Sequence, residues 1–212
     1  QPYAGQYLNY YAQSKATAEQ LVLAASNVTP YNSGLKTVAL RPHLIWGPND
    51  PHLVPRVLER AKAGRLKLVG STDKLVDTIY VDNAAYAHIL AAVELTKPEP
   101  QCLGKAYYIS NDEPITMAAM LNKILACQNL PPVTKRVPAS IAYGVGALLE
   151  GVYLALGKTQ EPMMTRFVAK QLSTSHYFDI SAAKRDFHYQ PLVSIDQGME
   201  YLAQSLRDKS TC

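Results

Sequence analysis

The sequence is poor in cysteine and in clustered charge, and each shortage argues against a class of protein. Its three cysteines, Cys102, Cys127 and Cys212, are too few and too widely spaced for a disulfide framework or a CxxC metal site. We therefore expect reduced thiols, a cytoplasmic location and no metal ion. The formal net charge is +4 and no dense basic block occurs, so we expect no nucleic-acid partner.

Two further patterns are missing. No stretch near the start resembles a signal peptide. No GxGxxG dinucleotide-binding sequence occurs anywhere; the nearest run, residues 144–151, has Leu149 where the third glycine belongs. That run lies in an apolar helical stretch, so we interpret its glycines as allowing close helix packing.

Helical and extended segments alternate along the first part of the chain. Apolar patterns predict helices at about residues 11–26, 54–63, 83–95 and 117–127, and short strands at residues 36–41, 66–69, 78–81 and 106–109. Asp82 and Thr116 precede two of these helices and are expected to be N-caps. The alternation predicts an α/β fold with a parallel sheet, and a last helix is expected at about residues 194–206.

Residues 137–157 form an apolar run with a single charged residue, Glu150. As a helix the run would be roughly 32 Å long, enough to cross a bilayer. Glu150 within the run, Pro138 and four glycines weaken that interpretation. We favour a packed helix, with a helix lying on a membrane surface as the second interpretation and a membrane span as the third.

The chemistry of the chain points first to Tyr11 and Lys15, which stand four residues apart in a helical segment. This spacing places a phenol and an ammonium group on the same helix face. A neighbouring cation favours the phenolate, so the phenol becomes a usable proton donor to a developing alkoxide. An isolated pair of this kind is weak evidence, and its weight comes from the motifs that follow it.

Three motifs occur in order: Tyr11-Ala-Gln-Ser-Lys15, then Arg41-Pro42-His43-Leu44-Ile45-Trp46-Gly47-Pro48, then Asp77-Thr-Ile-Tyr80-Val81-Asp82. Together they resemble the signatures of extended short-chain dehydrogenases/reductases, and most closely the 3β-hydroxysteroid dehydrogenase/isomerase family. Within it, the chain is similar to the branches that act on 2-alkyl-3-oxoalkanoates and on sterol-4α-carboxylates. The resemblance extends over nearly the whole chain.

The resemblance implies a role for several residues. Tyr11 matches the catalytic tyrosine, and Lys15 matches the lysine that supports it and binds the nicotinamide ribose. Pro42, Leu44 and Ile45 match the strand-end segment that approaches the nicotinamide of NAD or NADP. The residues expected to border the substrate are Trp46, Pro48 and His52.

Each of these positions also has a purely structural interpretation. Arg41-Pro42 could be only a strand end, and Trp46 could be a packing residue in the core. Asp82 fits a helix cap better than a catalytic acid. His43 and His52 stand near the predicted site, but isolated histidines are usually structural.

The resemblance further implies a C-terminal portion of a doubly wound, Rossmann-like parallel sheet over residues 1–110, and a smaller, mainly helical substrate lobe over residues 111–212. The dinucleotide-binding βαβ unit, of order a hundred residues, would be missing, so we expect the chain alone to be inactive.

The expected activity is NAD(P)-dependent interconversion of a secondary alcohol and a ketone on a large hydrophobic β-keto acid or sterol-like substrate. A sugar-nucleotide epimerase or dehydratase, or a non-catalytic NAD(P)-binding scaffold, is the alternative. Expected partners are a hydrophobic small molecule, a membrane surface contacting residues 137–157, and a second copy in a homodimer.

Overall fold

The computed structural model describes residues 3, 7, 10–26, 34–158, 160 and 162–211, with the side chains of residues 209–211 left aside. The chain forms two compact units that alternate along the sequence. Unit 1 comprises Gln1–Ile45, Asp77–Glu113 and Phe178–Ile195. Unit 2 comprises Trp46–Val76, Pro114–Tyr177 and Asp196–Cys212. The proposed division into a catalytic domain over residues 1–110 and a lobe over residues 111–212 stays a prediction.

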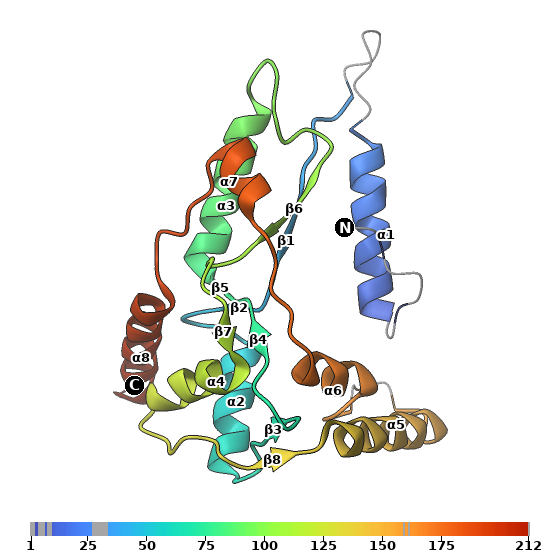
Figure 1. Ribbon diagram of the computed structural model, residues 1–212, viewed down its shortest axis with the longest axis vertical. Coiled ribbons are helices and arrows are strands. Elements are labelled where there is room, and N and C mark those ends of the chain that lie inside the picture. Colours follow the sequence, from blue (N-terminus) through green and yellow to red (C-terminus); the bar gives the residue numbers. More distant parts are fainter. Residues whose placement is uncertain are drawn as a thin grey trace. The chain divides into compact units, whose positions relative to one another are not determined.

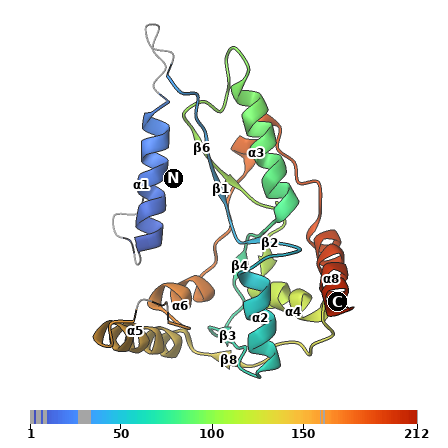
Figure 2. The same cartoon turned by 180° about the vertical axis from the view of Figure 1, so that it is seen from behind.

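Unit 1 is built around two parallel strands. Strand β1 (Ala39–Pro42) pairs in parallel with β6 (Ala106–Ile109), with Ala39 opposite Ala106 and Pro42 opposite Ile109. The other elements of the unit are α1 (Tyr10–Ala24), β5 (Ile79–Tyr80), α3 (Val81–Leu95) and α7 (Ser181–Phe187). Figures 1 and 2 show the β1–β6 pair between α1 and α3. Helices on both sides of parallel strands are the arrangement of a doubly wound α/β sheet, which confirms the predicted fold class.

The core of unit 1 forms between α3, α7 and β6. Small residues of α3, among them Ala87 and Ala91, are almost fully buried and let the helix approach the strand closely. The aromatic rings of Tyr107 and Phe187 meet edge to face, with 5.0 Å between their centres. Tyr107 also donates a hydrogen bond of 2.6 Å from its hydroxyl to the buried carboxylate of Asp186. The polar end of this tyrosine is thereby satisfied inside an apolar core.

Two buried amides join distant stretches of unit 1. The Asn83 side-chain oxygen accepts the N–H groups of Leu192 (2.8 Å) and Val193 (3.0 Å). Its Nδ2 donates to the Asn111 side-chain oxygen at 2.9 Å and to the Val193 carbonyl at 2.7 Å. The Asn111 oxygen also accepts the N–H of Tyr80. Because both amide side chains are buried, this network fixes where the start of α3, the segment after β6 and residues 192–193 meet.

The start of α3 corrects one prediction. Asp82 was expected to cap this helix, but the helix begins at Val81 and its N-cap is Tyr80, without a side-chain cap. The chain passes from β5 directly into α3, and the Asn111 side chain holds the Tyr80 N–H. Asp82 instead lies in the first helical turn, where a carboxylate interacts favourably with the helix dipole.

Unit 2 contains short strands and most of the helices. Strand β3 (Leu68–Val69) pairs in parallel with β8 (Arg136–Val137), and β4 (Leu75–Val76) pairs antiparallel with β7 (Ile115–Thr116). Strand β2 (Ile45–Trp46) begins at the boundary of the unit. The helices are α2 (Leu53–Lys62), α4 (Met117–Ala126), α5 (Ala139–Ala155), α6 (Arg166–Ser173) and α8 (Ile195–Thr211).

Amphipathic helices fill the interior of unit 2. Helix α2 packs against α4, whose buried residues are Met120, Leu121, Ile124 and Leu125. Thr116 caps α4 as predicted, accepting the Ala119 N–H at 3.1 Å. A second small cluster, formed by Val69, Ala142 and Ala169, joins β3 to α5 and α6.

The apolar run at residues 137–157 forms β8 in part and then the 17-residue helix α5. None of the helices in the described part of the chain is both long enough and apolar enough to traverse a bilayer. Gly146 of α5 confirms the packing interpretation of its glycines, because an added Cβ would lie 2.6 Å from the Thr165 carbonyl carbon. Gly144 and Gly151 have no neighbouring atom within 4 Å of such a Cβ, so for them that interpretation is wrong.

Candidate functional site

Helix α1 presents the predicted catalytic pair on its surface. Tyr11 is 70% exposed and Lys15 is exposed, and no described residue of the helix is buried. Glu19 follows Lys15 by another four residues, so the three side chains lie along one stripe of the helix. Both side chains are therefore exposed to solvent, and their catalytic roles stay predictions.

Glu19, at the C-terminal end of this stripe, forms an ion pair with Arg41 of β1. Arg41 donates from Nε to Glu19 Oε2 at 2.7 Å and from Nη2 to Glu19 Oε1 at 2.5 Å. Both side chains are largely shielded, with exposed fractions of 21% for Arg41 and 13% for Glu19. Two parallel bonds from a planar guanidinium define an orientation as well as a distance. The ion pair therefore holds the side of α1 that carries Glu19 against β1.

The ion pair also shifts the ionisation of its members. Hydrogen bonds from Arg41 lower the pKa of the Glu19 carboxyl below its ordinary value. The same contact raises the pKa of Arg41. Tyr3 donates its hydroxyl to Glu19 Oε1 at 2.6 Å, and this bond raises the pKa of Tyr3. Glu19 is thus a firmly ionised acceptor at neutral pH.

Aromatic rings support Arg41 on its other side. Its guanidinium carbon lies 5.1 Å from the centre of the Tyr108 ring. Tyr108 in turn stacks on Phe178, with ring centres 4.1 Å apart and an angle of 4° between the planes. His43 meets Phe178 edge-on, with ring centres 5.2 Å apart. Arg41 therefore does more than mark the end of β1, because its side chain contacts residues of both α1 and β6.

The segment after β1 has an unusual backbone. Leu44 adopts a positive φ of 46°, a left-handed conformation that costs an ordinary residue roughly 1 kcal/mol or more. Its carbonyl accepts the N–H of Ile79 at 3.2 Å. This turn leaves Pro42 partly buried and Ile45 43% exposed, so an apolar side chain faces solvent directly after a strand end. The roles of Pro42, Leu44 and Ile45 in cofactor binding stay predictions.

The residues predicted to border the substrate differ in their exposure. Trp46 is fully buried, which fits the packing interpretation better than contact with a ligand. Pro48 is partly buried and His52 is exposed. The backbone of His52 has a structural role, because its N–H donates to the Asp50 carboxylate at 2.8 Å. Asp50 also accepts the N–H of Val54 at 2.8 Å and so caps the start of α2, a role that sequence analysis missed.

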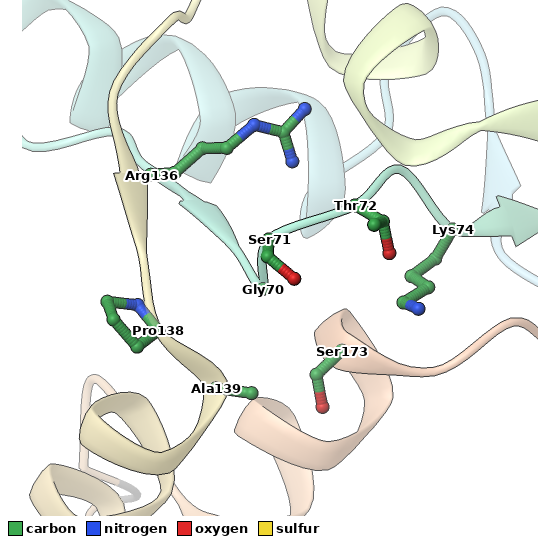
Figure 3. A pocket seen from close by; sticks show the side chains of 8 residues that line it. All are labelled: Gly70, Ser71, Thr72, Lys74, Arg136, Pro138, Ala139 and Ser173. Atoms are coloured by element: carbon green, nitrogen blue, oxygen red, sulfur yellow. The ribbon is translucent and has the colours of Figure 1, made fainter.

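A separate hollow lies within unit 2 and is shown in Figure 3. Its volume is about 460 Å³, and its lining consists of Gly70, Ser71, Thr72, Lys74, Arg136, Pro138, Ala139 and Ser173. The lining includes none of the residues predicted to form the site. Arg136 is ion-paired with Asp73, and the Ser173 hydroxyl donates to the Lys170 carbonyl at 3.1 Å. The hollow is open and its lining has no large apolar side chain, unlike the enclosed apolar pocket expected for a large hydrophobic substrate.

The two cysteines that the structure describes have no features of a reactive thiol. Cys102 is buried, and burial raises the pKa of its thiol. Cys127 follows α4, where burial raises its pKa and its Sγ lies 3.4 Å from the Met199 carbonyl oxygen. Both are free thiols, as expected, and Cys212 lies outside the described residues.

Comparisons with a family model and with curated proteins agree on one family for this chain. A sequence model of the 3-beta hydroxysteroid dehydrogenase/isomerase family matches residues 1–132. A 2-alkyl-3-oxoalkanoate reductase of Shewanella oneidensis is 68% identical over 97% of this chain and 54% of its own length. The human sterol-4-alpha-carboxylate 3-dehydrogenase, decarboxylating, is 37% identical over 97% of this chain and 55% of its own length. The chain spans about half the length of the curated relatives that it matches.

Solved structures share the fold at low sequence identity. A protein named gox2253 aligns over 95% of this chain and 57% of its own, with a TM-score of 0.66 and 20% identity. The UDP-glucuronic acid 4-epimerase of Bacillus cereus, solved in complex with NAD, aligns over 96% of this chain and 54% of its own, with a TM-score of 0.64 and 16% identity. At these identities the likeness establishes the fold alone.

Proposed function

Because the chain belongs to the 3-beta hydroxysteroid dehydrogenase/isomerase family, we propose that it supplies the proton-transfer residues of an NAD(P)-dependent oxidoreductase. The reaction is the interconversion of a secondary alcohol and a ketone. The observation that carries this proposal is the exposed Tyr11–Lys15 pair, whose helix face is held by the Glu19–Arg41 ion pair.

In the reducing direction Tyr11 donates its hydroxyl proton to the substrate oxygen as negative charge develops there. The ammonium of Lys15, one helical turn away, stabilises the phenolate that remains. Glu19 stands eight residues after Tyr11, about 12 Å along the helix, and acts as a positioning residue through Arg41. In the oxidising direction the same phenolate accepts the proton of the substrate hydroxyl.

The described residues fit part of a nicotinamide site. Lys15 offers exposed hydrogen-bond donors for a ribose, and the turn at Leu44 presents the apolar Ile45 side chain directly after the strand end. When bound, the nicotinamide supplies or takes up the hydride. Crevices at the carboxyl ends of parallel strands are where open α/β sheets bind such ligands.

The substrate we propose carries a carboxylate on the carbon next to the reacting C–O carbon. Both groups of named relatives suggest it, since a 2-alkyl-3-oxoalkanoate and a sterol-4-alpha-carboxylate oxidised at C3 share this arrangement. The higher identity to the reductase favours a 2-alkyl-3-oxoalkanoate, reduced to the 3-hydroxy acid. The Tyr-Lys pair alone would also suit a sugar-nucleotide epimerase or dehydratase, but the likeness to those enzymes rests on fold only.

The test is a substrate comparison with the full-length protein. We expect NADH or NADPH to be consumed with a long-chain 2-alkyl-3-oxoalkanoate, at a rate that exceeds the rate with a sterol ketone. A UDP-sugar should give neither consumption of reduced cofactor nor an epimerised product. Epimerisation without reaction of the keto acid would contradict the proposal, and cofactor binding without any turnover would support the scaffold alternative instead.

A further inference from the structure

His43 lies directly after β1, at the carboxyl end of the strand. It follows Arg41 by two positions, and side chains two positions apart in an extended chain project to the same face. The ring contacts agree with this register, because Arg41 lies over the Tyr108 ring and His43 meets Phe178. Tyr108 and Phe178 are themselves stacked. His43 therefore projects from the side of β1 on which Arg41 pairs with Glu19 of α1.

Helix α1 and strand β1 run side by side in opposite directions (Figure 1). Glu19 contacts Arg41, near the carboxyl end of the strand. Further along the helix, the Val22 carbonyl accepts the Thr37 hydroxyl at 2.9 Å, just before the strand begins. The earlier turns of α1 therefore extend past the carboxyl end of β1.

This direction brings Tyr11, Lys15 and His43 to the same end of unit 1. Lys15 precedes Glu19 by four residues, which is about 6 Å along a helix. His43 follows Arg41 by two residues, which is about 7 Å along an extended chain. The two advances start from one ion pair and are nearly equal, so His43 reaches the level of Lys15, and Tyr11 lies one helical turn further on.

The surroundings of His43 hold it in a defined orientation. The side chain is partly buried, and its ring meets Phe178 edge-on with 5.2 Å between the ring centres. Phe178 is itself fixed, because its N–H donates to the buried Asp77 carboxylate at 2.8 Å. Leu44, the next residue, adopts the left-handed conformation and accepts the Ile79 N–H at its carbonyl. Such support from neighbouring groups is what a ligand-binding side chain requires.

Most other cations of unit 1 are bound to acceptors within the unit. These pairs are Arg41 with Glu19, Lys97 with Glu94, Lys105 and Arg185 with Asp186, Lys184 with Asp112, and Lys36 with the Lys97 carbonyl. Lys15 has the role of supporting Tyr11, while His88 belongs to α3 and His188 ends α7. Among the described cationic and histidine side chains of unit 1, this leaves His43 for an anion at the carboxyl end of β1.

We propose that His43 determines specificity by binding the carboxylate of the substrate, next to the carbon whose oxygen meets Tyr11. The assignment rests on the proposed function, because it names the residue that recognises that class of substrate at the same site. An imidazole offers an N–H donor in its neutral and in its protonated form, so it suits a carboxylate in both. With the carboxylate held by His43, the neighbouring C–O group is turned toward the phenol of Tyr11.

The experiment compares a 2-alkyl-3-hydroxyalkanoate with its methyl ester, using the full-length protein and oxidised NAD or NADP. The hydroxy acid is used because the oxo acid readily loses carbon dioxide. We expect the parent to favour the acid by about tenfold or more in kcat/KM, since a hydrogen bond to a charged group is among the stronger ones. His43→Phe keeps a ring against Phe178 but has no donor, and this preference should disappear through a higher KM for the acid, with unchanged kinetics on the ester.

His43→Leu removes the ring as well as the donor and should lose the acid preference to the same extent. His88→Gln is the matched control, because His88 belongs to α3, which Figures 1 and 2 show across the β1–β6 pair from α1. This variant should retain the preference of the parent. Turnover of the ester by each variant reports that its fold and its Tyr11–Lys15 pair are intact.

An acid preference that survives in His43→Phe, or a parent without such a preference, would overturn this proposal and leave the proposed function standing. Equal losses on acid and ester would overturn it too, because the ring would then serve packing and not the carboxylate. A parent that oxidises neither compound would refute the proposed function, and the role of His43 with it.

Discussion

Arg41 and Glu19 form a two-point ion pair that joins strand β1 to the helix bearing Tyr11, although 22 positions separate them in the sequence. The pair is shielded from solvent and supported by the Tyr108 ring. It holds the side of α1 that carries Glu19 against β1 even though none of the described residues of that helix is buried. The orientation of Tyr11, the proposed proton donor, thus depends on polar contacts of α1 and not on apolar packing.

Tyr11→Phe in the full-length protein removes the proposed proton donor and little else. We expect kcat to fall by about two to four orders of magnitude, with cofactor affinity nearly unchanged. Tyr10→Phe is the control, because Tyr10 is the adjacent tyrosine and is 90% exposed. Steady-state kinetics and cofactor fluorescence titration measure both effects, and normal turnover of Tyr11→Phe would refute the mechanism.

Arg41→Lys keeps the positive charge but loses the two parallel bonds to Glu19. We expect kcat to fall by about tenfold, because small misplacements of catalytic groups are costly, while KM for the cofactor changes little. The more disruptive Arg41→Ala should be slower still. If kcat is preserved in both variants while only the melting temperature drops, Arg41 has a stabilising role alone.

The Glu19–Arg41 pair should make stability depend on pH in the acidic range. The pKa of Glu19 is lowered in the folded state by its bonds from Arg41, from a reference value of 4.5. The pair therefore stabilises the fold above that reference value, and the contribution is lost as pH falls through the lower, folded-state pKa. Urea unfolding of parent and Glu19→Gln should show a stability difference at pH 7 that shrinks below pH 4.5. A constant difference would contradict this assignment.

Tyr107→Phe tests the buried contact between Tyr107 and Asp186. Removing the hydroxyl leaves a buried carboxylate without one of its donors, so we expect a loss of about 1–2 kcal/mol in the free energy of unfolding. The urea midpoint should fall without a change in the slope. Tyr177→Phe, at a position that is 58% exposed, should stay within about 0.5 kcal/mol of the parent.

Gly146→Ala and Gly144→Ala form a matched pair within α5. The first places a methyl group 2.6 Å from backbone atoms of the α6 entry and should destabilise the protein by about 1–3 kcal/mol. The second meets no atom within 4 Å and should stabilise the helix by up to about 1 kcal/mol, because alanine has the better helix propensity. Equal effects of the two substitutions on the unfolding midpoint would show that α5 does not pack on α6 through Gly146.

Periodicity and local chemistry predicted most elements of the first part of the chain. Helices α1, α2, α3 and α4 and strands β1, β3, β5 and β6 all lie within a few residues of the predicted segments. Thr116 caps its helix because capping depends on neighbours three residues away, which the sequence displays. Asp82 does not, because Asn111, distant in sequence, determines where α3 begins.

The remaining features depend on long-range contacts that carry no local signal. Strands β4 and β7 were not predicted, because each is only two residues long and is defined by its pairing with the other, 40 positions away in the sequence. The four-residue spacing of Tyr11, Lys15 and Glu19 can be read from the sequence. The ion pair between Glu19 and Arg41 cannot, because an arginine before a proline does not indicate which residue its side chain contacts.

The interleaving of the two units along the chain limits how they can be separated. The polypeptide passes between them near residues 45, 76, 113, 177 and 195, so a single cleavage releases neither as a whole. Exchanging one unit for that of a relative would require several simultaneous junctions. Point substitutions therefore offer a simpler route to diversity in this architecture than the shuffling of whole modules.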